Sequence, residues 1–327
     1  MKNTDILNGS ATARGDLDAG GRLCLPSVNA KKNQTYRFTA SVRSFRQLIM
    51  GHGKTDYGSS YLVLSNTSLT VCRYDTELRS QTVEHALSIA GDLALTIEKK
   101  DALHADITVL SGGAGYTCGN VIWTGDSKGD CFVESDGSIL TDCVFTWSCT
   151  DFKNPLWIFG DSYCTFGSPY RWPWYLCEAG LQNKVHINAF PGESSPFALE
   201  AFLNSVTCYG RPETVLWTLG MNDGSDCGGA PCEKWLAPLK TVMQTCDLLG
   251  IELILATVPT VPERYHEEKN RFVRESGRRY IDFAEAVGAD GRGNWRKGML
   301  FTDRVHPDKK GAEALWQRIR RDLPELG

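Results

Sequence analysis

The chain has 327 residues, of which 42% are hydrophobic and 23% are charged. This length is enough for two ordinary domains. The formal net charge is only −4 at pH 7, so no overall positive field favours nucleic acid or an anionic membrane. No apolar stretch reaches the roughly 18 to 20 residues of a membrane span, and the amino terminus has no hydrophobic signal region. We expect a cytoplasmic protein without nucleic-acid or membrane partners, unless a leader was trimmed.

The first part of the chain, up to about residue 150, has short runs in which apolar and polar residues alternate. Residues 36–42, 94–98 and 105–110 are examples, and glycine, serine, aspartate and asparagine separate such runs. A period of two is typical of half-buried strands, and many short strands with turn residues between them favour an all-β fold. We predict a β-sandwich of the jelly-roll or lectin-like kind over residues 1–150.

After about residue 151 the pattern changes to buried apolar runs that alternate with longer segments of helical character. The predicted strands are 156–159, 185–189, 215–219, 253–258 and 280–283, and the predicted helices are 196–207, 233–249, 264–276 and 308–323. Serine before the first of these helices and glycine after the next two are typical helix boundaries. Alternating strands and helices imply a parallel sheet with helices on both faces. We predict an α/β domain over 151–327 with a five-stranded, flavodoxin-like parallel sheet.

The first strand of this α/β part ends abruptly at Gly160, Asp161 and Ser162. Such a turn presents the Ser162 hydroxyl at the carboxyl edge of the sheet, where α/β proteins bind ligands. A serine nucleophile needs a base, and His306 stands directly before the last predicted helix. Asp303, three residues earlier, is able to hold the imidazole in the right tautomer. These residue types indicate an activated serine.

Two more segments follow predicted strands, residues 188–194 and 219–224. In this order, the four segments resemble the four blocks of the SGNH (GDSL-type) hydrolase family, over about residues 155–322. The resemblance implies the SGNH hydrolase fold and a catalytic triad. Ser162 would be the nucleophile, His306 the general base and then acid, and Asp303 its orienting partner.

The same resemblance implies an oxyanion hole. Its donors would be the backbone N–H groups of Ser162 and Gly192 and the side-chain amide of Asn222, which together stabilise the negative charge of a tetrahedral intermediate. Glu193 departs from the family pattern, in which aspartate is common after the glycine. We expect little effect, because the donor at this point is a main-chain N–H.

Each segment alone has a plainer explanation. A serine after Gly-Asp is most often a turn or helix-cap residue, His306 with Pro307 is typical of a helix entry, and Asn222-Asp223-Gly224 is a common turn sequence. Their joint occurrence at three strand ends, in the family's order, favours the active site.

Four residues near these segments are candidates for substrate binding: Asp161, Trp172, Trp174 and Arg304. Large amphipathic rings beside an esterase site stack on sugars or wall an acyl pocket. The alternative for Trp172 is that it packs the first helix onto the sheet, and Trp174 is the better candidate for a wall. The Arg304 side chain points at either solvent or substrate.

The remaining histidines and cysteines have simpler interpretations. We expect His266 to be an exposed helical residue, His186 to lie in the core or at a sheet edge, and Cys164 to fill space beneath the site. The twelve cysteines of the chain show no tight metal-ligand pattern. Cys227 and Cys232 lie in one loop, where a small disulfide ring remains an alternative to two free thiols.

The sequence predicts a serine esterase that removes short acyl groups, acetyl above all, from carbohydrate hydroxyls. Such an enzyme needs no metal and no organic cofactor, and its partner is a small or oligosaccharide ester. Two alternatives stay open: a lipid esterase or thioesterase of the same family, and a non-catalytic glycan-binding protein. A homo-oligomer also stays open.

Overall fold

The fold is that of a computed structural model. It describes residues 3–7, 10–17, 22–24, 35–41, 48–50, 60–64, 68–75, 80–88, 93–99, 104–109, 116–122, 132–135, 140–149, 156–164, 169–181, 184–189 and 191–326. The chain divides into two compact units, one of Met1–Lys153 with Ala201–Gly210 and one of Asn154–Glu200 with Arg211–Gly327. The domain boundary between residues 150 and 151 stays a prediction.

The described strands of the first unit pair into two antiparallel sheets. A seven-stranded sheet has the order β1-β2-β13-β4-β9-β10-β11, and a six-stranded sheet has the order β3-β12-β5-β6-β7-β8. Their bounds are β1 Asn3–Leu7, β2 Ser10–Leu17, β3 Arg22–Cys24, β4 Thr35–Ser41, β5 Leu48–Met50, β6 Ser60–Leu64, β7 Ser68–Asp75, β8 Ser80–Ser88, β9 Leu93–Lys99, β10 His104–Val109, β11 Tyr116–Ile122, β12 Phe132–Ser135 and β13 Leu140–Cys149. The alternating runs fall on strands, whereas the sandwich stays a prediction.

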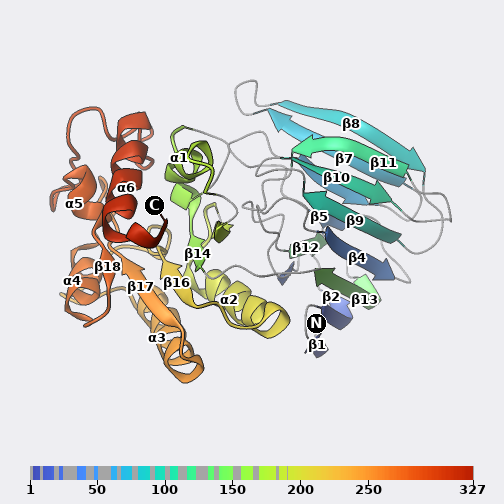
Figure 1. The fold of residues 1–327 in the computed structure, drawn as a ribbon, viewed down its shortest axis with the longest axis horizontal. Coiled ribbons are helices and arrows are strands. Elements are labelled where there is room, and N and C mark those ends of the chain that lie inside the picture. The colour runs from blue at the N-terminus through green and yellow to red at the C-terminus, as the bar shows by residue number, and fades with distance from the viewer. Residues whose placement is uncertain are drawn as a thin grey trace. The chain divides into compact units, whose positions relative to one another are not determined.

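The second unit contains a five-stranded parallel sheet (Figure 1). Its strands are β14 Leu156–Gly160, β15 Val185–Ala189, β16 Thr214–Trp217, β17 Glu252–Ala256 and β18 Tyr280–Ile281. They lie in the order β15-β14-β16-β17-β18, which is the 2-1-3-4-5 order of flavodoxin-like folds. Every residue of β14 and β15 is buried, as expected for strands covered on both faces. The predicted five-stranded parallel sheet is confirmed.

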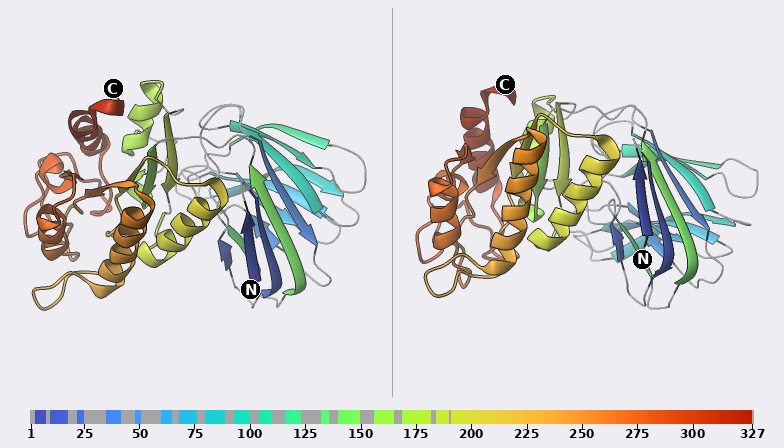
Figure 2. Two further views of the ribbon diagram at one scale, coloured as in Figure 1. Left: turned by 60° about the horizontal axis from the view of Figure 1, so that its bottom comes forward. Right: turned by 90° about the horizontal axis from the view of Figure 1, so that it is seen from below.

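Helices connect these strands. They are α1 Trp172–Glu178, α2 Ser195–Tyr209, α3 Glu233–Leu249, α4 Glu267–Glu275, α5 Phe283–Val287 and α6 Lys309–Asp322, with short 3₁₀ turns η3 Ser162–Cys164 and η5 Pro324–Leu326. α1 and α6 lie side by side, and α3 covers the opposite face of the sheet (Figure 2). The segment 283–287 was not predicted: the fifth strand ends at Ile281, and the Asp282 side chain caps α5 by accepting from Glu285 N.

The core between α1 and α6 is built around two tryptophans. The rings of Trp172 and Trp316 are 6.5 Å apart and nearly parallel, at 3°, and both residues are buried. Phe159 of β14 and Trp217 of β16 also stack, at 5.8 Å. Such large side chains bury much apolar area and hold the helices on the sheet.

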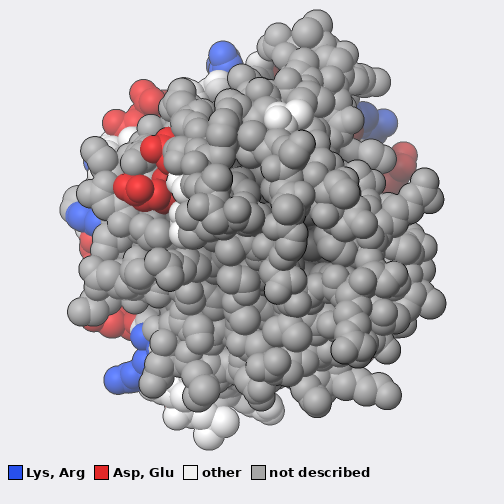
Figure 3. Space-filling view, turned by 90° about the vertical axis from the view of Figure 1, so that its right-hand side faces the viewer, with Lys and Arg blue, Asp and Glu red and all other residues white. Residues whose placement is uncertain are grey.

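None of the helices in the described residues combines the length and the apolar character that a membrane crossing requires. On the face drawn in Figure 3, both acidic and basic side chains of the described residues reach the surface. This mixture agrees with the nearly balanced charge of the chain.

Candidate active site

The turn after β14 presents Ser162 at the carboxyl end of the sheet. A Cβ atom on Gly160 would lie 2.3 Å from Cys164 Sγ and 2.6 Å from Thr218 Oγ1, so only glycine fits where the chain leaves the strand. Thr218, at the end of the neighbouring β16, donates its N–H to Phe159 O at 2.8 Å. Ser162 therefore lies where β14 and β16 end side by side, the point at which chain order switches direction and α/β folds bind ligands.

The structure brings the three predicted triad residues into one chain of hydrogen bonds. Ser162 Oγ lies 2.8 Å from His306 Nε2, and His306 Nδ1 lies 2.7 Å from Asp303 Oδ2. Both distances are within hydrogen-bond range. Ser162 is buried, while the imidazole is 20% exposed. The arrangement is one in which the imidazole is able to take the hydroxyl proton while the carboxylate holds its other nitrogen.

The carboxylate of Asp303 also shapes the loop that carries His306. Its Oδ1 accepts the backbone N–H groups of Val305 and His306, each at 2.9 Å. Arg304, which lies between Asp303 and Val305, has a left-handed φ of 62°, and this lets the loop fold back on the carboxylate. Partial burial alone would raise the pKa of Asp303, but the hydrogen bonds from the two N–H groups and the imidazole outweigh it, so the pKa is lowered. Asp303 is therefore ionised at neutral pH.

Tyr163, which sequence reasoning missed, connects the serine turn to the histidine loop. Its hydroxyl donates to Val305 O, and its ring centroid lies 6.0 Å from that of His306 and 6.3 Å from that of Trp295. Tyr163 is almost fully buried. Its only sequence signal is its position directly after Ser162.

The two further oxyanion candidates lie on adjacent loops. Asn222, after β16, donates its side-chain Nδ2 to Glu193 O at 3.0 Å, and Gly192 directly precedes Glu193. Gly192 has a left-handed φ of 75°, which favours glycine. An amide nitrogen carries two hydrogens, so the bond to Glu193 orients Asn222 and leaves a second N–H able to donate to an oxyanion.

Asp161 is a buried carboxylate that joins the serine turn to the Asn222 loop. It is 2% exposed and accepts the backbone N–H groups of Tyr163, at 3.0 Å, and of Met221. Burial raises its pKa to about 6, and the nearby charge of Asp223 adds to the rise, against those two hydrogen bonds. Asp161 is thus a framework residue of the site.

The raised pKa of Asp161 predicts a pH-dependent stability. A carboxyl whose folded-state pKa lies above its unfolded value stabilises the protein most when protonated, and this contribution is lost as pH rises through about 6. Between pH 4.5 and 7.5, Asp161→Asn should therefore gain free energy of unfolding relative to the wild type, by about 2 kcal/mol. Urea unfolding of both proteins at the two pH values measures this. An unchanged difference would contradict it.

The candidates for substrate binding differ in exposure. Trp172 is fully buried against Trp316 and Asp161 is almost fully buried, and a role of these two side chains in substrate binding stays a prediction. The packing alternative applies to Trp172, because its ring fills the space between α1 and α6. Trp174 is half-buried and Arg304 is exposed, and their contact with substrate stays a prediction.

An aromatic pair that was not predicted joins Tyr170, before α1, to Phe301 on the segment that leads into the histidine loop. Phe301 is 38% exposed, and its ring packs edge-on against Tyr170 at 5.4 Å. The Phe301 backbone N–H donates to His306 O at 2.8 Å, so this aromatic surface is fixed to the same loop as the imidazole.

The two other described histidines of this unit are buried. His186 in β15 is a core residue, as expected, but His266 is also fully buried, so its predicted exposure is wrong. Burial, together with the nearby charges of Lys269 and Arg264, lowers the pKa of His266 to about 3. Lys269 Nζ lies 3.0 Å from His266 Nδ1. The flanking charges suggested a solvated face, whereas Lys269 is itself buried.

The cysteines near the site agree with a packing role. Cys164 is buried, with its Sγ 3.0 Å from Thr218 Oγ1. Cys227 and Cys232 are both free thiols in the structure, which favours two free thiols over a disulfide ring. Among the residues that the structure describes, no group of three or more histidine, cysteine or carboxylate side chains is placed to hold a metal ion.

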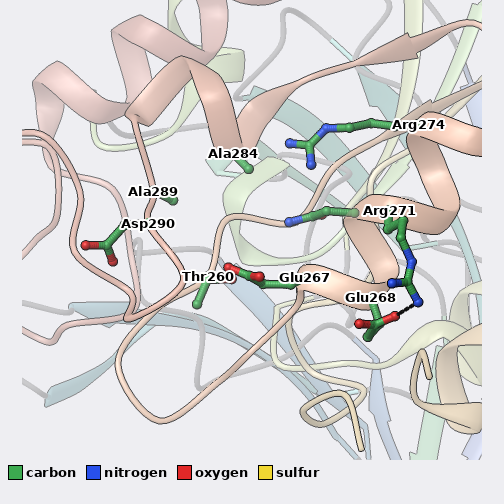
Figure 4. A pocket seen from close by; sticks show the side chains of 9 residues that line it. Thr260, Glu267, Glu268, Arg271, Arg274, Ala284, Ala289 and Asp290 are labelled. Atoms are coloured by element: carbon green, nitrogen blue, oxygen red, sulfur yellow. Dashed lines mark hydrogen bonds and ion pairs between the residues drawn. The ribbon is translucent and has the colours of Figure 1, made fainter. Parts of the chain in front are cut away.

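A polar cavity of about 290 Å³ lies at α4 and α5 (Figure 4), and none of the proposed triad residues lines it. Its lining includes Arg271, Arg274, Glu267, Glu268 and Asp290. Arg271 is paired with Glu268, and Arg274 with Asp282. Because each guanidinium already has a carboxylate partner, the cavity does not offer a concentrated charge to a ligand.

No model of a known protein family matches the chain, and no curated protein matches it. Several solved structures are similar. A GDSL-like lipase from Bacteroides thetaiotaomicron is 13% identical, with a TM-score of 0.41, and the match covers 52% of this chain and 87% of that one. An acetylxylan esterase from Geobacillus stearothermophilus is 19% identical, with a TM-score of 0.37 and coverage of 51% and 92%.

A carbohydrate esterase family 3 protein from Talaromyces cellulolyticus is 16% identical, with a TM-score of 0.39, and the match covers 53% of this chain and 98% of that one. The similar structures thus include GDSL-like hydrolases and acetylesterases. Because the identities and TM-scores are low, we base the proposed function on the residues of this chain.

Proposed function

We propose that this protein is a serine esterase of the SGNH type. The observation that carries the proposal is the hydrogen-bonded series Ser162–His306–Asp303, with donor–acceptor distances of 2.8 and 2.7 Å, at the carboxyl edge of a parallel sheet. These residues come from loops 144 positions apart in the chain. A turn serine or a helix-entry histidine has no need of such a contact, whereas nucleophilic catalysis requires it.

The reaction follows from the roles of the three groups. His306 Nε2 accepts the Ser162 proton while Ser162 Oγ attacks the ester carbonyl, and Asp303 stabilises the imidazolium that forms. The negative oxygen of the tetrahedral intermediate is held by the backbone N–H groups of Ser162 and Gly192 and by Asn222 Nδ2. Collapse of the intermediate transfers the proton from His306 to the leaving alcohol. Water then hydrolyses the acyl-serine by the same steps.

We propose carbohydrate acetyl esters as the substrate class. Support comes from the sequence resemblance to a family that often acts on glycan esters and from a first half rich in β-strands, which we propose to be a carbohydrate-binding sandwich. Phe301, on the loop of His306, and Tyr170, which precedes α1, offer an aromatic surface of the kind that stacks on sugar rings.

An acyl-length series tests this function. With p-nitrophenyl esters, kcat/KM should be highest for acetate and should fall by about tenfold or more by the octanoate, because a short acyl pocket excludes longer chains. Acetylated oligosaccharides should release acetate under the same conditions. A rise of kcat/KM with acyl length would favour a lipid esterase instead, and absence of all hydrolysis would favour a non-catalytic glycan-binding protein.

Asn222→Ala tests the proposed oxyanion hole. Loss of one preorganised donor should lower kcat by about 100- to 1000-fold, with a much smaller change in KM. Initial rates on p-nitrophenyl acetate measure this. Asn294→Ala is the matched control, because Asn294 also donates its Nδ2 to an oxygen at 3.0 Å, that of Asp290, in an exposed loop. Equal kcat values for the two variants would exclude Asn222 from the oxyanion hole.

A further inference from the structure

Asp223 connects the two loops that carry the proposed oxyanion donors. Its Oδ1 accepts the backbone N–H of Ser195 at 2.7 Å, and its Oδ2 accepts the Ser195 hydroxyl, also at 2.7 Å. The neighbouring Asn222 bonds Glu193 O on the same loop at 3.0 Å. Two adjacent side chains therefore reach two points of one loop, directly after Gly192.

This contact is buried and strong. Asp223 is 3% exposed and Ser195 is fully buried. Burial raises the pKa of Asp223, and the two bonds from Ser195 lower it in part, so these bonds offset some of the cost of burying the carboxylate. Ser195 is the first residue of α2, where backbone N–H groups lack helical partners and a carboxylate is favoured. The geometry of the start of α2 is thus tied to Asp223.

The Asp223 loop is held from its other side as well. Cys232 Sγ donates to Asp223 O at 3.0 Å, and the buried Lys269 donates its Nζ to Gly224 O at 2.6 Å. Lys269 also pairs with Asp226 at 3.2 Å. With its main chain fixed by these contacts, Asp223 presents its carboxylate to Ser195 from a rigid support.

We propose that Asp223 is a positioning residue of the esterase, which holds the Gly192 and Asn222 donors at the separation that a tetrahedral oxyanion requires. This role rests on the proposed function. The carboxylate touches no reacting atom and acts through the Ser195 end of the loop. Because oxyanion donors must be in place before charge develops, a shift of one loop relative to the other raises the barrier of the chemical step more than it weakens substrate binding.

The test compares Asp223→Ala with Asp223→Asn on p-nitrophenyl acetate. The alanine variant loses both bonds to Ser195, and we expect kcat to fall by about 10- to 100-fold while KM changes by less than about threefold. An asparagine oxygen still accepts the Ser195 N–H, and its amide donates to the Ser195 hydroxyl. Asp223→Asn should therefore retain kcat within about threefold of the wild type.

Asp282→Ala is the matched control for folding stability. Asp282 is also a buried carboxylate near a helix start, and it bonds Thr257, Arg274 and Glu285, none of which belongs to the proposed site. Below its unfolding transition, this variant should keep kcat within about twofold of the wild type. If Asp223→Ala does not fold, Ser195→Ala tests the positioning role in its place. This variant removes only the hydroxyl bond to Asp223 and should lower kcat by about two- to fivefold.

The positioning role is overturned if the kcat of Asp223→Ala stays within about twofold of the wild type. It is also overturned if Asp282→Ala lowers kcat as much as Asp223→Ala does, or if Asp223→Ala and Asp223→Asn lower kcat equally. Where alanine at 223 does not fold, an unchanged kcat in Ser195→Ala overturns it. Labelling of wild-type Ser162 by a fluorophosphonate probe separates the two proposals: without labelling or hydrolysis in the wild type, the proposed function itself has failed.

Discussion

Ser162→Ala is expected to lower kcat for p-nitrophenyl acetate by about 10⁴-fold or more, with little change in the free energy of unfolding. The physical reason is that the variant has no nucleophile, so the acyl-serine cannot form, and only transition-state stabilisation of attack by water remains. Substrate binding should persist, because the aromatic and oxyanion groups are unaltered. Steady-state rates, together with mass spectrometry of the acylated protein, measure the effect.

The control for this variant is Ser276→Ala. Ser276 Oγ donates to Val273 O at 2.7 Å at the end of α4, so its replacement removes a serine hydroxyl bond outside the proposed site. It should leave kcat within about twofold of the wild type. Residual activity of Ser162→Ala above about 1% of the wild type would show that another group attacks the ester.

The second large effect concerns the base and its partner. His306→Ala should lower kcat by about 10⁴-fold or more. The fold-decrease in kcat for Asp303→Asn should be about 10 to 100 times smaller than that for His306→Ala. The base has no substitute, whereas an orienting group is partly replaceable by water or a neighbouring carbonyl. An asparagine at 303 also keeps an oxygen for the N–H groups of Val305 and His306, so the loop should stay folded. Initial rates across a pH series measure both losses.

Chemical rescue provides the control for the histidine. Added imidazole should restore part of the activity of His306→Ala, because it enters the space left by the side chain and accepts the Ser162 proton. Added imidazole should not restore the activity of Ser162→Ala. Equal losses in His306→Ala and Asp303→Asn, or the absence of rescue together with an intact fold, would contradict the assigned roles.

Much of the second unit was predictable from local patterns. Apolar runs bounded by glycine or polar turns coincide with β14, β15 and β16 within about two residues, because a strand buried on both faces must be apolar throughout. The helix Glu233–Leu249 was predicted with its observed bounds. The short helix Phe283–Val287 was missed, since its apolar residues continue the run of the preceding strand and the Asp282 cap resembles any turn aspartate.

Within the candidate site, the residue types of the triad were recognisable because the chemistry restricts which side chains serve. The contacts that support the triad and the oxyanion donors were not recognisable from the sequence. Asp223 and Ser195 lie 28 positions apart, and nothing in either segment specifies that one bonds the other. Likewise, Trp172 was open to two interpretations, and its stacking on Trp316 depends on where α6 packs.

The order of the five strands and of the longer helices in the second half, and the presence of Ser162, Asp303 and His306 at segment ends, were readable from the amino-acid sequence. Both depend on residue type and spacing along the chain. Three contacts became visible only in the folded chain: the Ser162 hydroxyl bonds the imidazole, His266 is buried beside Lys269, and Asp223 joins two loops. These contacts depend on how helices and strands distant in sequence pack against each other, and the same residue types also occur in exposed turns and helix caps.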